Sequence, residues 1–216
     1  MNIRALTAEF LGVFALCFVG IGAIAATQGG DLIALALAHG LAIGLSVVAL
    51  GAVSGGHFNP AVTFAMLITG RITLLGALGY WVAQLLGGLL AAFFIGAIYG
   101  GTAVADGTPV PGANHTAIQA LMMEIFLTFF LVSVIFGSAV FNNYSFAGLA
   151  IGLAVTMDIL AGGAVSGAAM NPARALGPAI IGGEWSAHWV YWAGPLVGAG
   201  LAGLLYDFLY AKEAEG

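Results

Sequence analysis

The sequence has very few charged residues and a single cysteine. Lysine and arginine contribute four side chains and aspartate and glutamate nine, so that only 6% of the 216 residues are charged. A soluble domain normally carries about a quarter charged residues, and a chain this poor in charge cannot cover its own surface in water. With Cys17 alone, a disulfide framework within the chain is excluded. The net charge of −5 is spread over loops and the tail and indicates no nucleic-acid partner.

What the chain has in abundance is apolar surface. Hydrophobic residues make up 62% of it, and the mean hydropathy is +1.09. Such a composition is typical of a protein whose solvent is the lipid bilayer. A hydrocarbon core about 30 Å thick needs roughly 20 apolar residues per helical crossing, so the length allows about six crossings with short connections. We therefore expect residues 1–216 to form a single all-α transmembrane domain.

The apolar residues fall into long and short segments separated by glycine-rich and polar breaks. Segments long enough to span a membrane are predicted at 4–26, 32–52, 73–99, 114–139, 145–163 and 188–210. Two further apolar segments, 58–69 and 170–181, are too short to cross. The stretch from Gly100 to Gly112 contains two prolines and is expected to be a break.

The two halves of the chain repeat each other. The letters GLAIGL at 40–45 recur at 148–153, GAVSG at 51–55 recurs at 163–167, and Asn-Pro-Ala at 59–61 recurs at 171–173. Three spans per half is an odd number, so the repeats, at about 1–100 and 114–210, must be inverted relative to each other in the membrane. The two short segments then enter from opposite faces and meet at the midplane.

An Asn-Pro dipeptide opens each short segment, at Asn59 and Asn171. A helix that begins in mid-membrane leaves its first N–H groups without partners, and lipid supplies none. Asparagine is a strong N-cap, and proline at the first helical position has no N–H to leave unsatisfied. Each half-helix also brings about +0.5 charge at its N-terminus. Two such ends facing each other repel cations, while the asparagine amides can still donate hydrogen bonds to a neutral guest.

The basic residues predict an orientation. Arg4, Arg71 and Lys212 all fall on one side of the six-span arrangement. By the positive-inside rule this side is cytoplasmic. We therefore expect a multi-pass protein with both termini in the cytoplasm, located in the cell membrane.

Taken together, these features resemble the aquaporin (major intrinsic protein) family over essentially the whole chain. The matching residues are the motifs Asn59-Pro60-Ala61 and Asn171-Pro172-Ala173, Arg174 directly after the second, Ala8-Glu9-Phe10 and Met123-Glu124-Ile125. The resemblance implies six transmembrane helices plus two re-entrant half-helices in an inverted repeat. It also implies a passive water channel that excludes protons and ions, assembled as a homotetramer with one pore per subunit. No cofactor or metal is expected.

Glu9 and Glu124 lie within predicted spans, where a carboxylate is expensive and is kept for a reason. The resemblance implies that both accept hydrogen bonds from the backbone of the re-entrant loops. A proton relay is the alternative interpretation. It needs a chain of ionisable groups, and none links these two.

A selectivity constriction is implied by the resemblance at His39, Ile159, Ala168 and Arg174. A rise of 1.5 Å per residue places His39 about 10 Å below one face and Ile159 about 21 Å above the other, which is one level. Arg174 supplies fixed positive charge against cations and protons, and His39 supplies a titratable group. This set resembles the plant tonoplast subgroup, of which some members pass ammonia. We therefore expect water to be the main molecule that permeates, with ammonia and other small neutral solutes as further candidates.

Other functions fit less well. A glycerol or broad small-solute facilitator is the alternative, but such channels usually carry an aspartate soon after the second motif's arginine, where this chain has Ala175 and Ala179. A secondary transporter needs a coupling-ion site, and the midplane offers only amides and backbone. No nucleophile–base pair or metal cluster points to an enzyme.

Two residues keep open interpretations. His115 either leans over the pore mouth or is a solvated loop histidine. Asp158 adjoins Ile159 and should face away from the pore if Ile159 faces into it, where it could pair with a loop group.

Overall fold

The computed structural model describes residues 2–211, and every regular element in that range is helical. In chain order these are α1 (Ile3–Thr27), α2 (Leu32–Ser54), α3 (Pro60–Ile68), α4 (Leu74–Tyr99), α5 (Gly101–Asp106), α6 (Ala117–Ile135) with the π-helix η1 (Phe136–Val140), α7 (Ala147–Ser166), α8 (Pro172–Gly182) and α9 (Val190–Leu209). Six of them, with α6 and η1 taken as one, are long and apolar enough to cross a membrane. The predicted six spans and two short half-helices are thereby confirmed.

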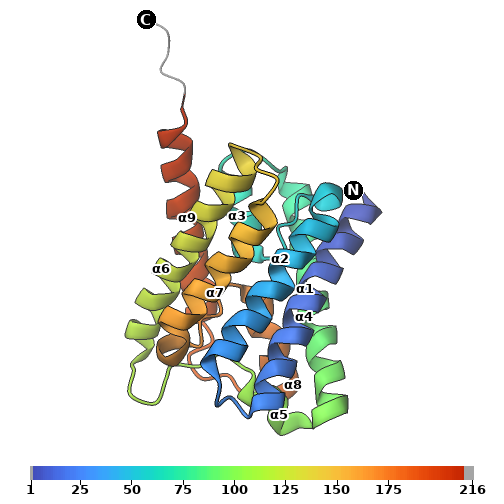
Figure 1. Cartoon of the computed structure of the whole chain (residues 1–216), viewed down its shortest axis with the longest axis vertical. Helices are drawn as coiled ribbons and strands as arrows, with labels where there is room; N and C mark the ends of the chain where they lie inside the picture. The colour runs from blue at the N-terminus through green and yellow to red at the C-terminus, as the bar shows by residue number, and fades with distance from the viewer. Residues whose placement is uncertain (1, 212–216) are drawn as a thin grey trace, which may run out of the picture.

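The long helices run side by side as a bundle, with the half-helices α3 and α8 inside its two ends (Figure 1). The start of α1 and the end of α9 lie at the same end of the bundle, and α5 lies at the other. We call these two ends the terminal face and the α5 face. The half-helix α3 lies toward the terminal face and α8 toward the α5 face, so the two approach the middle from opposite sides.

Both half-helices are capped as their sequences predict. The Oδ1 atom of Asn59 accepts the N–H of Ala61 at 2.8 Å, and that of Asn171 accepts the N–H of Ala173 at 3.0 Å. A proline follows each asparagine at the first helical position. The first orphan donors of each half-helix are thus satisfied without water or lipid.

Glycines let the long helices approach closely. A Cβ at Gly40 of α2 would lie 2.5 Å from the carbonyl oxygen of Gly152 in α7, and one at Gly44 would lie 2.9 Å from that of Gly148. Between α9 and α6, a Cβ at Gly198 would lie 2.2 Å from the carbonyl oxygen of Ile125. Small residues at helix contacts are typical of membrane bundles, where close backbone approach replaces the hydrophobic driving force.

The outer surface of the bundle is apolar. Large hydrophobic side chains are exposed along the long helices, among them Leu45, Val82, Phe126, Leu153 and Leu201. Polar and charged side chains are instead buried inside, including Glu9, Gln84 and Glu124. This inversion of the soluble pattern supports an integral membrane protein.

The structure differs from the expectation between residues 100 and 112. This stretch was expected to be a break, but Gly101–Asp106 form the short helix α5. Val104 of α5 is fully buried, and a Cβ at Gly182 of α8 would lie 2.6 Å from the backbone nitrogen of Ala105. Packing against the half-helix α8 therefore orders a segment whose glycines and prolines suggest a loop. Lys212, used above for orientation, lies outside the described residues.

Candidate functional site: a passage between the half-helices

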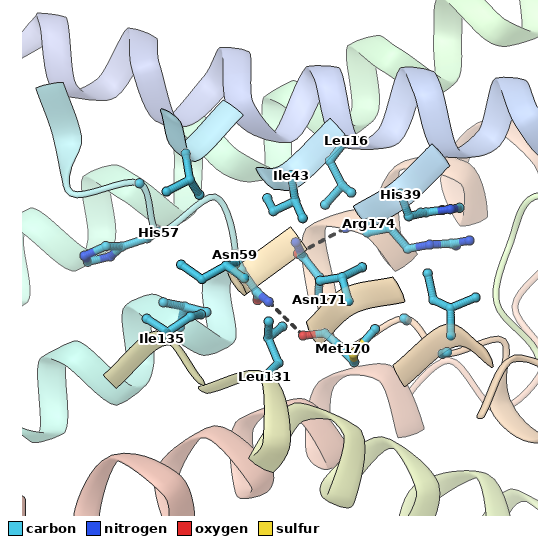
Figure 2. A pocket seen from close by; sticks show the side chains of 18 residues that line it. Leu16, His39, Ile43, His57, Asn59, Leu131, Ile135, Met170, Asn171 and Arg174 are labelled. Atoms are coloured by element: carbon cyan, nitrogen blue, oxygen red, sulfur yellow. Dashed lines mark hydrogen bonds between the residues drawn. The ribbon is translucent and has the colours of Figure 1, made fainter. Parts of the chain in front are cut away.

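A passage runs through the bundle past the N-termini of both half-helices (Figure 2). His57 lies at one end of it, Asn59 and Asn171 lie in the middle, and His39 and Arg174 lie at the other end. Its walls are otherwise apolar. They come from Leu16, Ile43, Val47, Val62, Leu131, Ile135, Ile151, Val155 and Ile159.

The middle of the passage is built by a reciprocal exchange of hydrogen bonds. The Nδ2 atom of Asn59 donates to the carbonyl of Met170 at 2.8 Å, and that of Asn171 donates to the carbonyl of Phe58 at 2.9 Å. An amide nitrogen carries two hydrogens, so each asparagine keeps one donor for a guest. Because each Oδ1 accepts the first N–H groups of its own half-helix, the remaining amide hydrogens are the donors that the two side chains offer to a guest.

Glu9 holds the loop before the first half-helix. Its Oε1 accepts from the Ser54 hydroxyl at 2.6 Å and from the N–H of His57 at 3.0 Å. Its Oε2 accepts from the N–H of Phe58 and from the Gln84 amide, both at 2.7 Å. The buried carboxylate thus has four donors, which offset the cost of its burial.

Glu124 does the same for the second loop. It accepts from the Ser166 hydroxyl at 2.7 Å and from the N–H groups of Ala169 and Met170 at 2.8 and 2.7 Å. Within residues 2–211 no side-chain amide donates to Glu124, because the position equivalent to Gln84 is Pro195. The two carboxylates are therefore equivalent in their loop contacts and differ in this one partner.

The loops need such support because their backbone is strained. Phe58, Ala168 and Met170 have φ values of 46°, 44° and 52°, in the left-handed region that non-glycine residues rarely adopt. Such conformations cost on the order of 1–3 kcal/mol each and persist where surrounding contacts impose them. The strained turns aim loop carbonyls at the opposite asparagine.

His39, Ile159, Ala168 and Arg174 all line the passage, and each is at most 5% exposed. The guanidinium of Arg174 donates from one Nη to the carbonyl of Gly107 at 2.8 Å. The Nδ1 atom of His39 lies 2.8 Å from the carbonyl of Leu35. A carbonyl only accepts, so Nδ1 carries the proton and Nε2 of the neutral ring is an acceptor.

At His39, Ile159 and Arg174 the passage opens into a wider space toward the α5 face. The vestibule there is lined by the end of α5 and the loop after it, including Asp106, Thr108 and Pro109, and it has a volume of about 280 Å³. The passage itself leaves about 30 Å³ to a water-sized guest. The narrow part therefore starts at the level of Arg174 and His39, which line both spaces.

Several supporting contacts were not predicted. The hydroxyl of Tyr80 donates to the carbonyl of Ser54 at 2.6 Å, and that of Tyr191 donates to the carbonyl of Ser166 at 2.8 Å. These tyrosines occupy equivalent positions in the two repeats, each directly before a tryptophan, Trp81 or Trp192, and this match is the signal that could have found them. The Gly107 carbonyl that fixes Arg174 has no such signal, because it is a backbone atom of an irregular loop.

His115 and Asp158, whose interpretation the sequence left open, both lie away from the passage. His115 lines neither the passage nor the vestibule; it is half-buried, and its Nδ1 atom is enclosed without a partner among residues 2–211. Asp158 is buried beside Ile159 but does not line the passage. No loop group within that range pairs with its Oδ2 atom.

Comparison with known proteins places this architecture among related chains. The family model described as major intrinsic protein matches residues 1–206. The chain is 44% identical to the probable aquaporin TIP3-2 of Arabidopsis thaliana, covering 96% of this chain and 84% of that one. It is 45% identical to the aquaporin TIP4-4 of Zea mays, covering 98% and 88%. Among solved structures it resembles the aquaglyceroporin from Plasmodium falciparum, with a TM-score of 0.87, 26% identity and 98% of both chains covered.

Proposed function

The chain belongs to the major intrinsic protein (aquaporin) family and is a passive water channel, and we propose that His39, Ile159, Ala168 and Arg174 determine what else passes. The observation that carries the mechanism is the reciprocal pairing of Asn59 and Asn171 with the opposite loops. It leaves one amide hydrogen on each asparagine free to donate to a guest in the middle of the passage. As a member of this family, the chain is a channel and not an enzyme.

The midplane explains how water passes while protons do not. A water molecule there turns its oxygen toward the two asparagine N–H groups, so its hydrogens point away along the passage. Its oxygen then has no lone pair left to accept a proton from a neighbouring water. The half-helix N-termini of α3 and α8 add positive potential at the same level, which opposes hydronium and other cations.

The constriction adds a second filter. Arg174 is held by the Gly107 carbonyl, so its remaining N–H groups are available to a guest as donors with a fixed positive charge. His39 offers an acceptor through Nε2. Ile159 and Ala168 provide apolar walls, and alanine leaves space. We propose that this combination admits water and ammonia and rejects ions.

The glycerol alternative finds no support among the curated relatives, which are named aquaporins. The similarity to the Plasmodium aquaglyceroporin is at 26% identity and is carried by the shared fold. Two alanines, Ala175 and Ala179, also stand after Arg174 in place of the aspartate expected of glycerol channels.

The chain is an integral multi-pass membrane protein. We propose that its terminal face is cytoplasmic, because Arg4 and Arg71 lie on that side. The plant relatives are of the tonoplast type and give no support to the cell membrane that we expected. A homotetramer with one passage per subunit is proposed from the family resemblance.

Reconstituted liposomes test the function. We expect osmotic shrinkage much faster than in empty liposomes, a faster internal alkalinisation on exposure to ammonia, and little glycerol uptake. His39→Ala should widen the constriction and raise solute uptake, whereas His115→Ala is the matched control because His115 lines neither space. Water permeability equal to that of empty liposomes would overturn the main function. Unchanged solute discrimination in His39→Ala would contradict only the assignment of His39 to the selectivity constriction.

A further inference from the structure

Among the described residues that line the passage, His57 is the one titratable side chain at the terminal-face end (Figure 2). Its Nδ1 atom lies 3.1 Å from the Thr63 hydroxyl oxygen. The ring of Tyr80 stands edge-on against it, with centroids 5.1 Å apart and planes at 72°. The Nε2 atom has no hydrogen-bond partner among residues 2–211 and is not enclosed by protein. Because His57 lines the passage, Nε2 is the ring atom available to a guest.

The orientation of the Gln84 amide is fixed by Glu9. Besides Gln84, three groups reach the Glu9 carboxylate, and two of them are backbone N–H groups, which can only donate. This surrounding of donors stabilises the ionised carboxylate. An ionised carboxylate only accepts, so the Gln84 amide must turn its nitrogen toward it, at 2.7 Å from Oε2.

The same nitrogen reaches Thr63. It lies 2.9 Å from the Thr63 hydroxyl oxygen, so its two hydrogens serve Glu9 and Thr63. The threonine hydroxyl therefore accepts from Gln84 and has its own hydrogen left to donate. Within residues 2–211, Nδ1 of His57 is the one further partner of that hydroxyl.

We propose that Gln84, acting through Thr63, is a positioning residue that sets the tautomer of His57. Nδ1 accepts the threonine hydroxyl, the proton of the neutral ring sits on Nε2, and Nε2–H points into the passage as a donor. His39 at the opposite end has the reverse tautomer, because its Nδ1 donates to the Leu35 carbonyl. The two pore histidines thus present opposite polarity to a guest.

This assignment deepens the channel function proposed above and rests on it. A donor at His57 follows the donors of Asn59 and Asn171, so half of the passage requires a guest with a lone pair. Water and ammonia have one. Ammonium has none and cannot accept from these donors. Gln84 has no equivalent in the second repeat, so the polarity of this end is a property of the first half alone.

Nitrogen-15 NMR on the histidine-labelled protein in lipid bilayers tests the assignment. The chain has four histidines, and the signals lost in His57→Asn identify those of His57. We expect Nε2 of His57 to be protonated and Nδ1 to be unprotonated. His39 and His188 should show the reverse, because His188 Nε2 accepts the Trp192 indole N–H at 3.1 Å. A wild-type His57 with its proton on Nδ1 would overturn the proposal without any variant.

Matched variants test the hydrogen-bond chain that runs from Gln84 through Thr63 to His57. Thr63→Ser keeps the hydroxyl and should keep the single tautomer, whereas Thr63→Val removes it and should produce a mixture. Gln84→Met keeps the size but removes the amide donor. Both lone pairs of the Thr63 hydroxyl oxygen are then free to accept, instead of the one that Gln84 leaves free in the native protein, so the Nδ1–H tautomer should gain population there too. If both Thr63→Val and Gln84→Met retained a single Nε2–H tautomer, Gln84 and Thr63 would not set the tautomer of His57.

The NMR readout does not depend on transport. A protein that fails to conduct water but shows the expected tautomers would refute the channel function and leave the tautomer assignment standing. A protein that conducts water with the opposite His57 tautomer would refute only the present inference.

Discussion

Gly20 of α1 faces the imidazole of His39 so closely that a Cβ at position 20 would lie 2.2 Å from Nε2. The histidine ring therefore occupies the space that any other residue at position 20 would fill. Its Nδ1 atom is tied back to the Leu35 carbonyl, so the ring is held between α1 and its own helix. The width of the passage at this level depends on a residue that does not itself line it.

Gly20→Ala should push the His39 ring into the passage and reduce water permeability. Overpacking of this kind costs about 1–3 kcal/mol, and the ring can relieve it only by moving toward open space. Gly22→Ala is the control, because a Cβ there meets Ile95 at an ordinary 3.4 Å. Stopped-flow osmotic shrinkage of matched liposomes measures both. Wild-type permeability in Gly20→Ala would contradict the packing explanation.

Gly152→Ala should destabilise the contact between α2 and α7. A Cβ at this position would lie 2.5 Å from the carbonyl oxygen of Gly40, a backbone atom that cannot move without shifting the helix. We expect a loss of about 1–3 kcal/mol, seen as a lower thermal unfolding midpoint in detergent. Gly51→Ala, whose Cβ meets Val47 at 3.6 Å, should leave the midpoint unchanged or raise it. Equal effects of the two substitutions would argue against close backbone approach.

Glu124→Gln should weaken the second re-entrant loop. Both carboxylate oxygens accept hydrogen bonds, from Ser166, Ala169 and Met170, so an amide nitrogen in place of either oxygen faces a donor. An unsatisfied buried donor costs about 1–3 kcal/mol. Thermal unfolding and the yield of folded protein measure the loss. Asp106→Asn, an exposed carboxylate, is the control and should behave as the wild type.

Arg71 should contribute more to stability than its ion-pair partner. It pairs with Asp207 at 2.7 Å, donates to the Thr69 carbonyl at 3.0 Å, and stacks over the rings of Phe136 and Phe141 at 5.2 and 4.9 Å. The partly exposed ion pair is worth about 1 kcal/mol at most, while each cation–π contact adds about 0.5–1 kcal/mol.

We therefore expect Arg71→Gln to lower the unfolding midpoint more than Asp207→Asn does. High salt should reduce the effect of Asp207→Asn, because salt screens the ion pair. Equal losses from the two substitutions would mean that the aromatic contacts of Arg71 contribute nothing measurable.

The features that the sequence could predict are those with a local or periodic signal. Long apolar runs locate the six spans, and the Asn-Pro dipeptides locate the N-termini of α3 and α8, because capping depends on neighbouring residues. The repeat fixes the inversion of the two halves, since it follows from an odd number of spans. The family resemblance supplied the four constriction residues, all of which line the passage, and their role as a selectivity constriction stays a proposal.

The features that could not be predicted from the sequence depend on contacts between distant segments. The helix α5 forms because Val104 finds a buried site against neighbouring helices, which no local pattern shows. The contact of Arg174 with the Gly107 carbonyl joins residues 67 positions apart. The hydrogen-bond chain from Gln84 to His57 requires the Gln84 amide to reach both Glu9 in α1 and Thr63 in the half-helix α3. Each is visible only once the helices are in place.

The reciprocal pairing at the midplane also sets an order of assembly. Asn59 needs the Met170 carbonyl, and the Phe58 carbonyl needs Asn171, so neither loop completes its hydrogen bonds until both have been synthesised. At about 5–20 residues per second, the first loop waits roughly 6–20 s for the second. During that interval the nascent first half carries unpaired polar groups at the bilayer centre, and it depends on the translocon or on trapped water to shelter them. The hydrogen bonds at the centre of the channel therefore form only after both halves have been inserted into the membrane.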